Sequence, residues 1–215
     1  KNKESITSLI NQISNYNCNE QKINNITFKA RESKNSYLQK INKIKHHIKR
    51  GDIYEINYCQ EFFNDNILIS PHNIFYHLNM STKSPFASFL KNDNINLMGF
   101  SPERYLCKDN LKVISQPIKG TSKRSNDSVE DNYLFNNLLK SKKDISENIM
   151  IVDLVRNDLS ITAKSGSVNV DKLCGVYSFS NVHQMISTVS SELENGTHFT
   201  DVIKSSFPMG SMTGA

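Results

Sequence analysis

Two residues of opposite charge lie in segments that are otherwise apolar or small. Lys119 stands between Ile118 and Gly120, in what reads as a restrained apolar turn. A lysine held in an apolar pocket loses its proton more easily and can act as a nucleophile. Glu103 follows Pro102 between two expected strands, where a carboxylic acid with a raised pKa could protonate a leaving group. From the residues alone, Lys119 could also be an ordinary surface lysine on a turn, and Glu103 a solvated or turn-capping carboxylate.

A pair of acidic residues suits a metal ion. Asp144 and Glu147 are three residues apart on an expected helix, which places both carboxylates on one face. Such a pair fits Mg²⁺, which takes few protein ligands and keeps several waters. The alternative is that both acids only answer the partial positive charge at the start of the helix. The residues alone leave both interpretations open.

The last residues of the chain are rich in glycine and hydroxyl groups. The run Gly210 to Gly214 offers backbone N–H groups that could hold a carboxylate, with Ser211 as the candidate contact. Gly120 and Thr121, beside Lys119, are candidates of the same kind. A plain loop explains the glycine-rich run just as simply.

Helices and strands of ordinary length are expected to position these residues. Helices are expected at about 6–13, 36–50, 71–80, 128–140, 144–161 and 200–206, with a loop at 207–215. Strands are expected at 53–63, 85–90, 95–100, 104–107, 111–115, 167–173 and 180–193. Antiparallel-looking strands with intervening helices predict an α+β fold in which antiparallel sheets are flanked by helices.

The composition narrows the class of protein. Hydrophobic residues make up 37% and charged residues 22% of the 215 residues, which fits a folded chain. The net charge of +5 is mild, and the basic clusters at 40–50 and 140–143 lie near expected helix ends, so nucleic-acid binding is not expected. No apolar run approaches the roughly 18 residues of a membrane span, and the N-terminus lacks a signal-peptide pattern. A cytoplasmic location without a membrane partner is therefore expected.

The cysteines show no pattern of a metal site. They are widely separated along the chain: Cys18, Cys59, Cys107 and Cys174. We expect reduced thiols that are buried or half-buried, with Cys59 and Cys107 inside strands.

Five segments, in their order and spacing, resemble the chorismate-binding enzyme family, which includes anthranilate, aminodeoxychorismate, isochorismate and salicylate synthases. The segments are GDIYEINYCQ (51–60), SPERYL (101–106), QPIKGTSKR (116–124), ENIMIVDLVRNDLS (147–160) and FPMGSMTGA (207–215). The resemblance covers roughly residues 36–215, which would form the central part of a chorismate-binding catalytic domain. Residues 1–35 would be a poorly patterned remnant, and the chain is expected to be cut at both ends.

The resemblance gives Lys119 and Glu103 specific roles. Lysine in PIKGT resembles the aminodeoxychorismate synthase branch, whereas anthranilate synthases typically carry alanine there. The branch implies that Lys119 attacks C4 of chorismate and that ammonia then displaces the lysine, on the way to 4-aminobenzoate and folate. Glu103, in the SPE motif, would be the general acid that assists departure of the C4 hydroxyl.

The resemblance also implies a magnesium site and substrate contacts. Glu147 would hold Mg²⁺ against the substrate carboxylate, with Asp144 in a supporting role. Ser211 would contact the substrate from a GSxTGAPK-like loop, and Gly120 and Thr121 would lie beside the ring. Relatives continue beyond this loop with a second metal-binding glutamate and an arginine for the substrate carboxylate.

Three positions depart from, or match, particular branches of the family. Gln184 stands where many relatives have a histidine that contacts the ring; glutamine can hydrogen-bond there but cannot exchange a proton. Glu55 stands where isochorismate-forming relatives carry a lysine that activates water, which argues against that chemistry. Pro85, Phe86 and Ala87 match the place where several relatives contact tryptophan.

The remaining expectations concern partners and alternatives. Nothing in the chain resembles the Cys-His-Glu site of a glutamine amidotransferase, so such a subunit is expected to supply ammonia. Anthranilate synthase component I is the alternative within the family. A truncated module that binds chorismate without turnover is the alternative outside catalysis.

Overall fold

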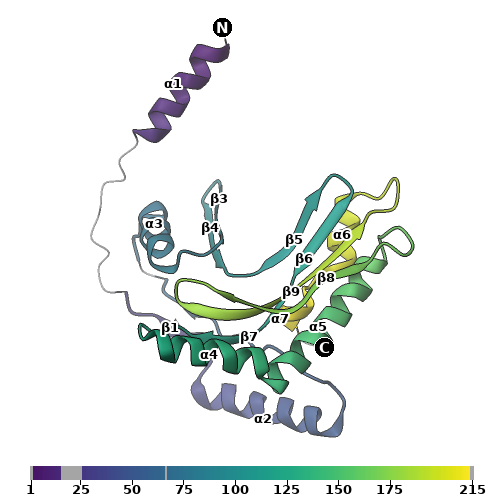
Figure 1. Cartoon of the computed structure of the whole chain (residues 1–215). Helices are drawn as coiled ribbons and strands as arrows, with labels where there is room; N and C mark the ends of the chain where they lie inside the picture. Colours follow the sequence, from purple (N-terminus) through teal and green to yellow (C-terminus); the bar gives the residue numbers. More distant parts are fainter. Residues whose placement is uncertain (1, 16–25, 66, 214–215) are drawn as a thin grey trace. The chain divides into compact units, whose positions relative to one another are not determined.

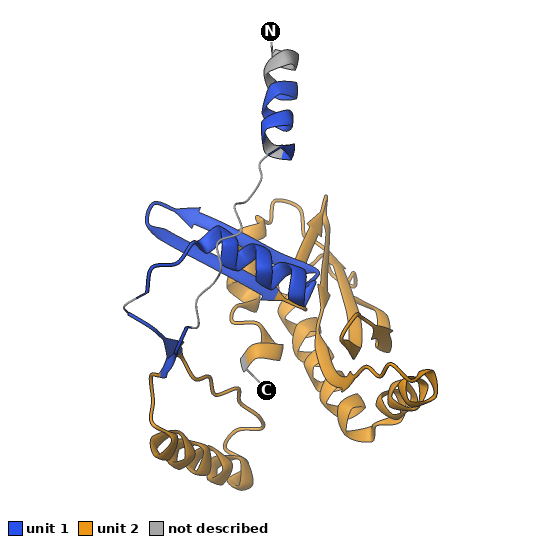
Figure 2. Cartoon of the chain, turned by 90° about the vertical axis from the view of Figure 1, so that its left-hand side faces the viewer, with its two compact units in different colours: residues 1–29, 62–100 blue, residues 30–61, 101–215 orange. Residues whose placement is uncertain are grey.

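The structure is a computed structural model that describes residues 2–15, 26–65 and 67–213. The chain divides into two compact units (Figure 2). Unit 1 contains residues 1–29 and 62–100, and unit 2 contains residues 30–61 and 101–215. None of the described helices is both long enough and apolar enough to cross a membrane.

Unit 1 contains two helices and a hairpin. Its elements are α1 (Asn2–Ser14), α3 (Pro71–Thr82), β3 (Phe86–Asn92) and β4 (Ile95–Ser101), and the two-residue strands β1 (Lys29–Ala30) and β2 (Phe62–Phe63) mark the ends where the chain passes between units. α3 begins with proline at its first position, as the sequence predicts. The Phe75 ring of α3 packs against Phe89 and Phe100 of the hairpin, with centroid distances of 5.5 and 5.4 Å.

Unit 2 contains the larger sheet and most of the helices. Its helices are α2 (Lys34–Arg50), α4 (Ser128–Lys140), α5 (Lys142–Ser160), α6 (Phe199–Ser206) and α7 (Gly210–Thr213). Its strands are β5 (Arg104–Asp109), β6 (Lys112–Gln116), β7 (Ile118–Lys123), β8 (Asn169–Ser178) and β9 (Val182–Glu192). α2 starts at the Ser33 cap and stops at Gly51, whose φ of 79° is the left-handed conformation that glycine adopts readily.

The sheet of unit 2 is built around β9 (Figure 1). β8 pairs with one edge of β9, while β6 and β7 pair with it in succession, and β5 extends the sheet beyond β6. All of these pairings are antiparallel. The predicted α+β fold with antiparallel sheets and flanking helices is confirmed.

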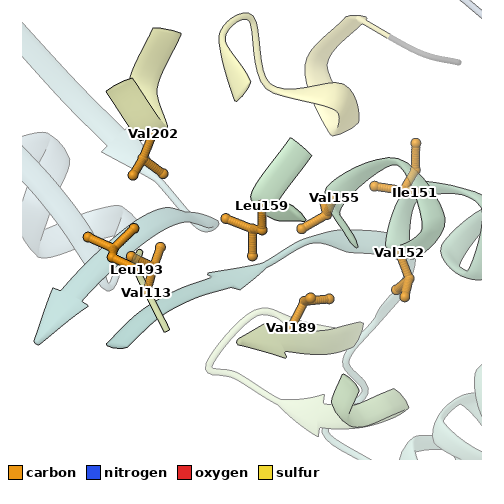
Figure 3. Close-up of a cluster of buried hydrophobic side chains, with 8 residues drawn as sticks. All are labelled: Val113, Ile151, Val152, Val155, Leu159, Val189, Leu193 and Val202. Atoms are coloured by element: carbon orange, nitrogen blue, oxygen red, sulfur yellow. The ribbon is translucent and has the colours of Figure 1, made fainter. Parts of the chain in front are cut away.

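The hydrophobic core lies between α5 and the sheet. Apolar side chains recur along α5 at intervals that keep them on one face of a helix, and strands and α6 supply the opposing residues (Figure 3). The members are Ile151, Val152, Val155 and Leu159 of α5, Val113 of β6, Val189 of β9, Leu193 and Val202. Burying each of these side chains stabilises the fold by about 1.5–3 kcal/mol, so the core fixes α5 against the strands.

The prediction of a long strand over residues 53–63 is wrong, since only Phe62 and Phe63 form a strand. A strand needs a neighbour for its backbone hydrogen bonds, and among the described residues this segment has one only at its end, where the Arg31 N–H donates to the Glu61 carbonyl at 2.8 Å. Side chains hold this segment instead. The Tyr58 hydroxyl donates to Glu32 at 2.7 Å, and the Gln60 amide donates to the Glu32 carbonyl at 2.8 Å.

Smaller corrections concern the last loop and the thiols. Residues 210–213 of the expected loop form the short helix α7. Cys59, Cys107 and Cys174 are free thiols, but Cys59 is exposed and outside any strand. Cys18 lies outside the described residues.

Candidate active site

The site is organised by an irregularity where β7 pairs with β9. β6 keeps a constant register against β9, from Lys112 opposite Glu192 to Ser115 opposite Val189. β7 begins in that same register, but the pairing then shifts between Ile118 and Thr121. Such a shift is a β-bulge, which bends a strand and re-aims its side chains. The expected turn is therefore a bulged strand, and Lys119 lies in the bulge.

Gly120 allows this bulge and the close approach of a helix. Its φ is 95°, a conformation that residues with a Cβ rarely adopt. A Cβ at this position would also lie 2.9 Å from the Cβ of Asp144, in the first turn of α5. The missing side chain therefore lets the start of α5 pack directly on the bulge. Gly120 acts in this structure through its backbone, while its predicted substrate contact stays a prediction.

Asn148 of α5 fixes the backbone of the bulge from within the core. It is buried, and its amide donates to the Lys119 carbonyl at 3.3 Å and to the Met185 carbonyl of β9 at 3.1 Å. Its oxygen accepts from the Ser187 hydroxyl and from the Cys174 thiol. These four contacts use the full hydrogen-bonding capacity of an asparagine side chain. The backbone that carries Lys119 is thus tied to both α5 and β9.

The Lys119 side chain meets a carboxylate from the irregular segment before β2. Its Nζ lies 3.3 Å from Glu55 Oε1, and the two side chains are only 18% and 26% exposed. The Glu55 oxygen is buried and has no hydrogen bond of good geometry within the described residues. A partly buried lysine next to an acceptor with free lone pairs is well placed for proton exchange.

Glu103 also lies near Lys119, close enough for the lysine charge to act on its pKa. Ser101 bonds the backbone of Glu103 through its hydroxyl and shapes the turn before β5. The carboxylate accepts from the Ile118 N–H at 3.0 Å, at the start of the bulge. Burial raises the pKa of Glu103, against smaller lowering effects of the Ser211 hydroxyl, the Ile118 N–H and the Lys119 charge. A carboxyl group that keeps its proton at higher pH is suited to general acid chemistry.

The chain end closes onto this group of residues. The Asn57 amide donates to the Ser211 carbonyl at 3.3 Å and to the Met212 carbonyl at 2.6 Å, which ties α7 to the segment that carries Glu55. The Ser211 hydroxyl lies close enough to Glu103 to lower its pKa, yet its buried oxygen has no hydrogen bond of good geometry in the described chain. A buried hydroxyl with spare capacity fits a ligand contact, and the substrate contact expected of Ser211 stays a prediction.

The two carboxylates expected to hold a metal lie on α5 as predicted. Asp144 faces the bulge, and Glu147 follows three residues later with its side chain 34% exposed and 3.7 Å from Lys143. Among the described residues, no group of three or more His, Cys, Asp or Glu side chains gathers in a metal-binding arrangement. The donor set present is thus one accessible carboxylate with a second beside it, which fits an ion that keeps most of its waters.

Thr121 and Gln184 lie opposite each other where β7 meets β9. Gln184 is buried, one step along β9 from His183. His183 faces the other way: its ring nitrogens lie 2.8 Å from the Ser178 hydroxyl and 3.1 Å from Asp131. Thr121 and Gln184 therefore border the bulge, whereas His183 has a structural environment.

Three of the predicted residues lie in unit 1: Pro85, Phe86 and Ala87 are at the start of the β3 hairpin. A polar cavity of about 410 Å³ in unit 2 is lined by none of the predicted site residues.

Sequence reasoning missed the contributions of Glu55, Asn57 and Asn148. Asn148 carried a usable signal, because a polar residue on the buried face of an apolar helix needs partners. Glu55 and Asn57 carried little signal, because their roles depend on contacts with residues 64 and at least 154 positions away.

Comparisons with known proteins identify the family and the fold of the chain. The sequence profile described as chorismate binding enzyme matches residues 2–215. Aminodeoxychorismate synthase component 1 of Escherichia coli (strain K12) is 36% identical over 183 residues, which cover 85% of this chain and 40% of that protein. Anthranilate synthase alpha subunit 1, chloroplastic, of Arabidopsis thaliana is also 36% identical, over 179 residues that cover 83% of this chain and 30% of that protein.

A solved structure shares the fold. Anthranilate synthase component I from Streptococcus pneumoniae TIGR4 superposes with a TM-score of 0.84 at 24% identity, covering 99% of this chain and 47% of that one. The chain thus spans less than half the length of these relatives. The profile covers nearly all of its sequence, and the chain therefore belongs to the family of chorismate binding enzymes.

Proposed function

We propose that this chain carries the C4-amination chemistry of an aminodeoxychorismate synthase. The observation that supports this choice is the environment of Lys119: the lysine is mostly buried in a bulge, 3.3 Å from Glu55, and its charge acts on the pKa of Glu103. A lysine so placed is suited to nucleophilic catalysis. An alanine there, as in typical anthranilate synthases, would leave Glu55 without its partner.

The proposed reaction has two substitutions at C4 of chorismate. The neutral Lys119 amine attacks C4 as the C4–O bond breaks, and Glu103 donates a proton so that the hydroxyl leaves as water. Ammonia then attacks C4 and displaces the lysine, which gives 4-amino-4-deoxychorismate. Ser211, Gly120, Thr121 and Gln184 are proposed to contact the substrate around this centre.

Magnesium is proposed as the cofactor, with Glu147 as its ligand and Asp144 in support. When bound, the ion would hold a substrate carboxylate and offset its charge. We expect Glu147→Ala to lower the affinity for Mg²⁺ at least about tenfold, because one carboxylate is a large part of a sparse ligand set. Isothermal calorimetry with MgCl₂ measures this directly, and affinity equal to wild type would remove Glu147 from the ligand set.

The ammonia is proposed to come from a glutamine amidotransferase subunit. The Escherichia coli relative is named as component 1 of its enzyme, which is compatible with a separate partner. A place in the route to 4-aminobenzoate and folate, a cytoplasmic location and a tryptophan pocket at residues 85–87 stay predictions.

Anthranilate synthase is the second candidate, since relatives of both kinds match at 36% identity. The full-length protein, supplied with chorismate, ammonium chloride and MgCl₂, distinguishes them by product. We expect 4-amino-4-deoxychorismate, identified by chromatography and mass. Fluorescent anthranilate would instead assign the protein to the second candidate. Chorismate binding without either product would indicate a non-catalytic module.

A further inference from the structure

Two carboxylates lie near Lys119, and they differ in what they bind. Glu103 accepts the Ile118 N–H and lies beside the Ser211 hydroxyl. Glu55 faces the Lys119 ammonium, and the oxygen that does so has no hydrogen bond of good geometry within the described chain. One carboxylate is thus supported by donors, while the other has spare lone pairs and lies 3.3 Å from the lysine nitrogen.

A nucleophilic lysine must first lose a proton, and the site must provide a group that takes it. Glu103 is suited to the opposite task, because burial raises its pKa and favours the protonated acid. Two further acidic residues lie near the start of α5: Asp144, which packs beside Gly120, and Glu147, which pairs with Lys143. Glu55 is the carboxylate that forms an ion pair with Lys119 itself.

We propose that Glu55 is the proton acceptor for Lys119, a catalytic role that rests on the proposed lysine-linked amination. The proposal makes Glu103 the acid and Glu55 the base around one amine. In other enzymes too, the environments of two carboxylates decide which one acts as acid and which as base. The role also gives a reason for the hydrogen bonds that hold the segment around Glu55. Asn57, two residues later, fastens this segment to the backbone of α7.

The proton balance closes over the full cycle. Glu55 takes one proton from the Lys119 ammonium, and the freed electron pair forms the bond to C4 while the C4–O pair leaves with oxygen. Glu103 protonates that oxygen, which departs as water. Ammonia forms the new C4–N bond and releases Lys119 as the neutral amine, which regains its proton from Glu55. The product ammonium returns a proton to Glu103, so both carboxyl groups end as they began.

The test compares Glu55 variants with a matched control in the full-length protein. Glu55→Gln keeps the shape but removes the base, and Glu55→Asp keeps the base but shortens its reach. Glu61→Gln is the control, since Glu61 lies in the same segment but is exposed and pairs with Arg31. We expect Glu55→Gln to lower kcat about 100-fold at every pH, Glu55→Asp to retain part of it, and the control to match wild type.

A second measurement separates proton transfer from simple charge pairing. If Glu55 only stabilises the Lys119 ammonium, Glu55→Gln will move the acidic limb of the kcat profile to lower pH and leave its plateau unchanged. If Glu55 accepts the proton, added formate will restore part of the kcat of Glu55→Ala in proportion to its concentration. Thermal melts of each variant establish that it is folded.

The outcomes are distinguishable from a failure of the proposed function. A wild-type plateau in Glu55→Gln, or no formate rescue of folded Glu55→Ala, would overturn the acceptor role while wild type still forms 4-amino-4-deoxychorismate. Anthranilate from the wild-type protein would overturn the proposed function, and the acceptor role with it.

Discussion

β6 and β7 run in succession along the same edge of β9, yet they serve different purposes. β6 keeps its register and directs Val113 into the core, where it is fully buried. β7 shifts its pairing between Ile118 and Thr121 and carries a glycine with positive φ and a partly buried lysine. The regular pairing of β6 with β9 positions a core residue, and the one-residue shift in the pairing of β7 with β9 positions the candidate site. Substitutions in β6 and in β7 should therefore affect stability and activity separately.

The largest effect is expected from the bulge lysine. Lys119→Ala in the full-length protein should lower the formation of 4-amino-4-deoxychorismate about 1,000-fold or more, because the nucleophile is lost. Product chromatography measures the loss, and circular dichroism checks the fold. Lys112→Ala on β6 is the matched control, since this lysine is half exposed in a surface ion pair with Asp171 and should change stability by less than about 1 kcal/mol. Equal turnover in both variants would contradict the division between the strands.

The next effect should come from the shape of the bulge. Gly120→Ala meets both an unfavourable φ and the Asp144 side chain, so we expect a loss of about 1–3 kcal/mol in the free energy of unfolding together with reduced turnover. Gly166→Ala has a similar φ of 75° but open space around it. Urea denaturation of the two variants separates the contact with α5 from the backbone strain. A larger loss in Gly166→Ala would show that the close packing at Gly120 is unimportant.

A core substitution in β6 should change the free energy of unfolding but not the turnover. Val113→Ala removes two methyl groups from the core between β6 and α5, and we expect it to cost about 2 kcal/mol of unfolding free energy. Turnover per folded molecule should stay near the wild-type value, because Val113 lies outside the bulge. A fall in kcat as large as that of Gly120→Ala would mean that core and site are not separable.

The smallest effect concerns pH. Because burial raises the pKa of Glu103 in the folded protein above its ordinary value of 4.5, the folded state binds more protons than the unfolded state between these two values. The contribution of Glu103 to stability is therefore full below pH 4.5, declines as pH rises to the raised pKa, and then levels off. Glu103→Gln should remove this decline, so wild type loses stability relative to the variant as pH rises.

Urea titrations from pH 4 to pH 8 can follow this difference. Glu192→Gln, at the end of β9 opposite β6, is the reference for losing one exposed carboxylate at the regular end. A difference between wild type and Glu103→Gln that stays constant with pH would contradict the raised pKa.

Many of the helix boundaries and the buried face of α5 could be predicted from local sequence. The proline after Ser70, the glycine after Arg50 and the apolar stripe of α5 mark elements close to where they lie. These signals depend on a few neighbouring residues, so they survive without knowledge of the fold.

The site depended more on distant contacts. Lys119 and Gly120 read as part of a turn, and only the pairing with β9 shows that they lie in a bulge. The apolar run at 53–63 reads as a strand, but a ladder requires a partner that no local pattern reveals. Asn148 is an unremarked polar residue in sequence until its contacts with Lys119 and Met185 are known.

The tie between Asn57 and α7 has a consequence for the timing of synthesis. The bonded residues are 154 and 155 positions apart in the chain. At a translation rate of about 5–20 residues per second, roughly 8–30 s separate the synthesis of the two partners. During that interval the segment with Glu55 exists without the residues that fasten it beside Lys119. The core also needs Val189 and Val202, so it too is completed late, just ahead of the α7 residues that fasten the segment with Glu55.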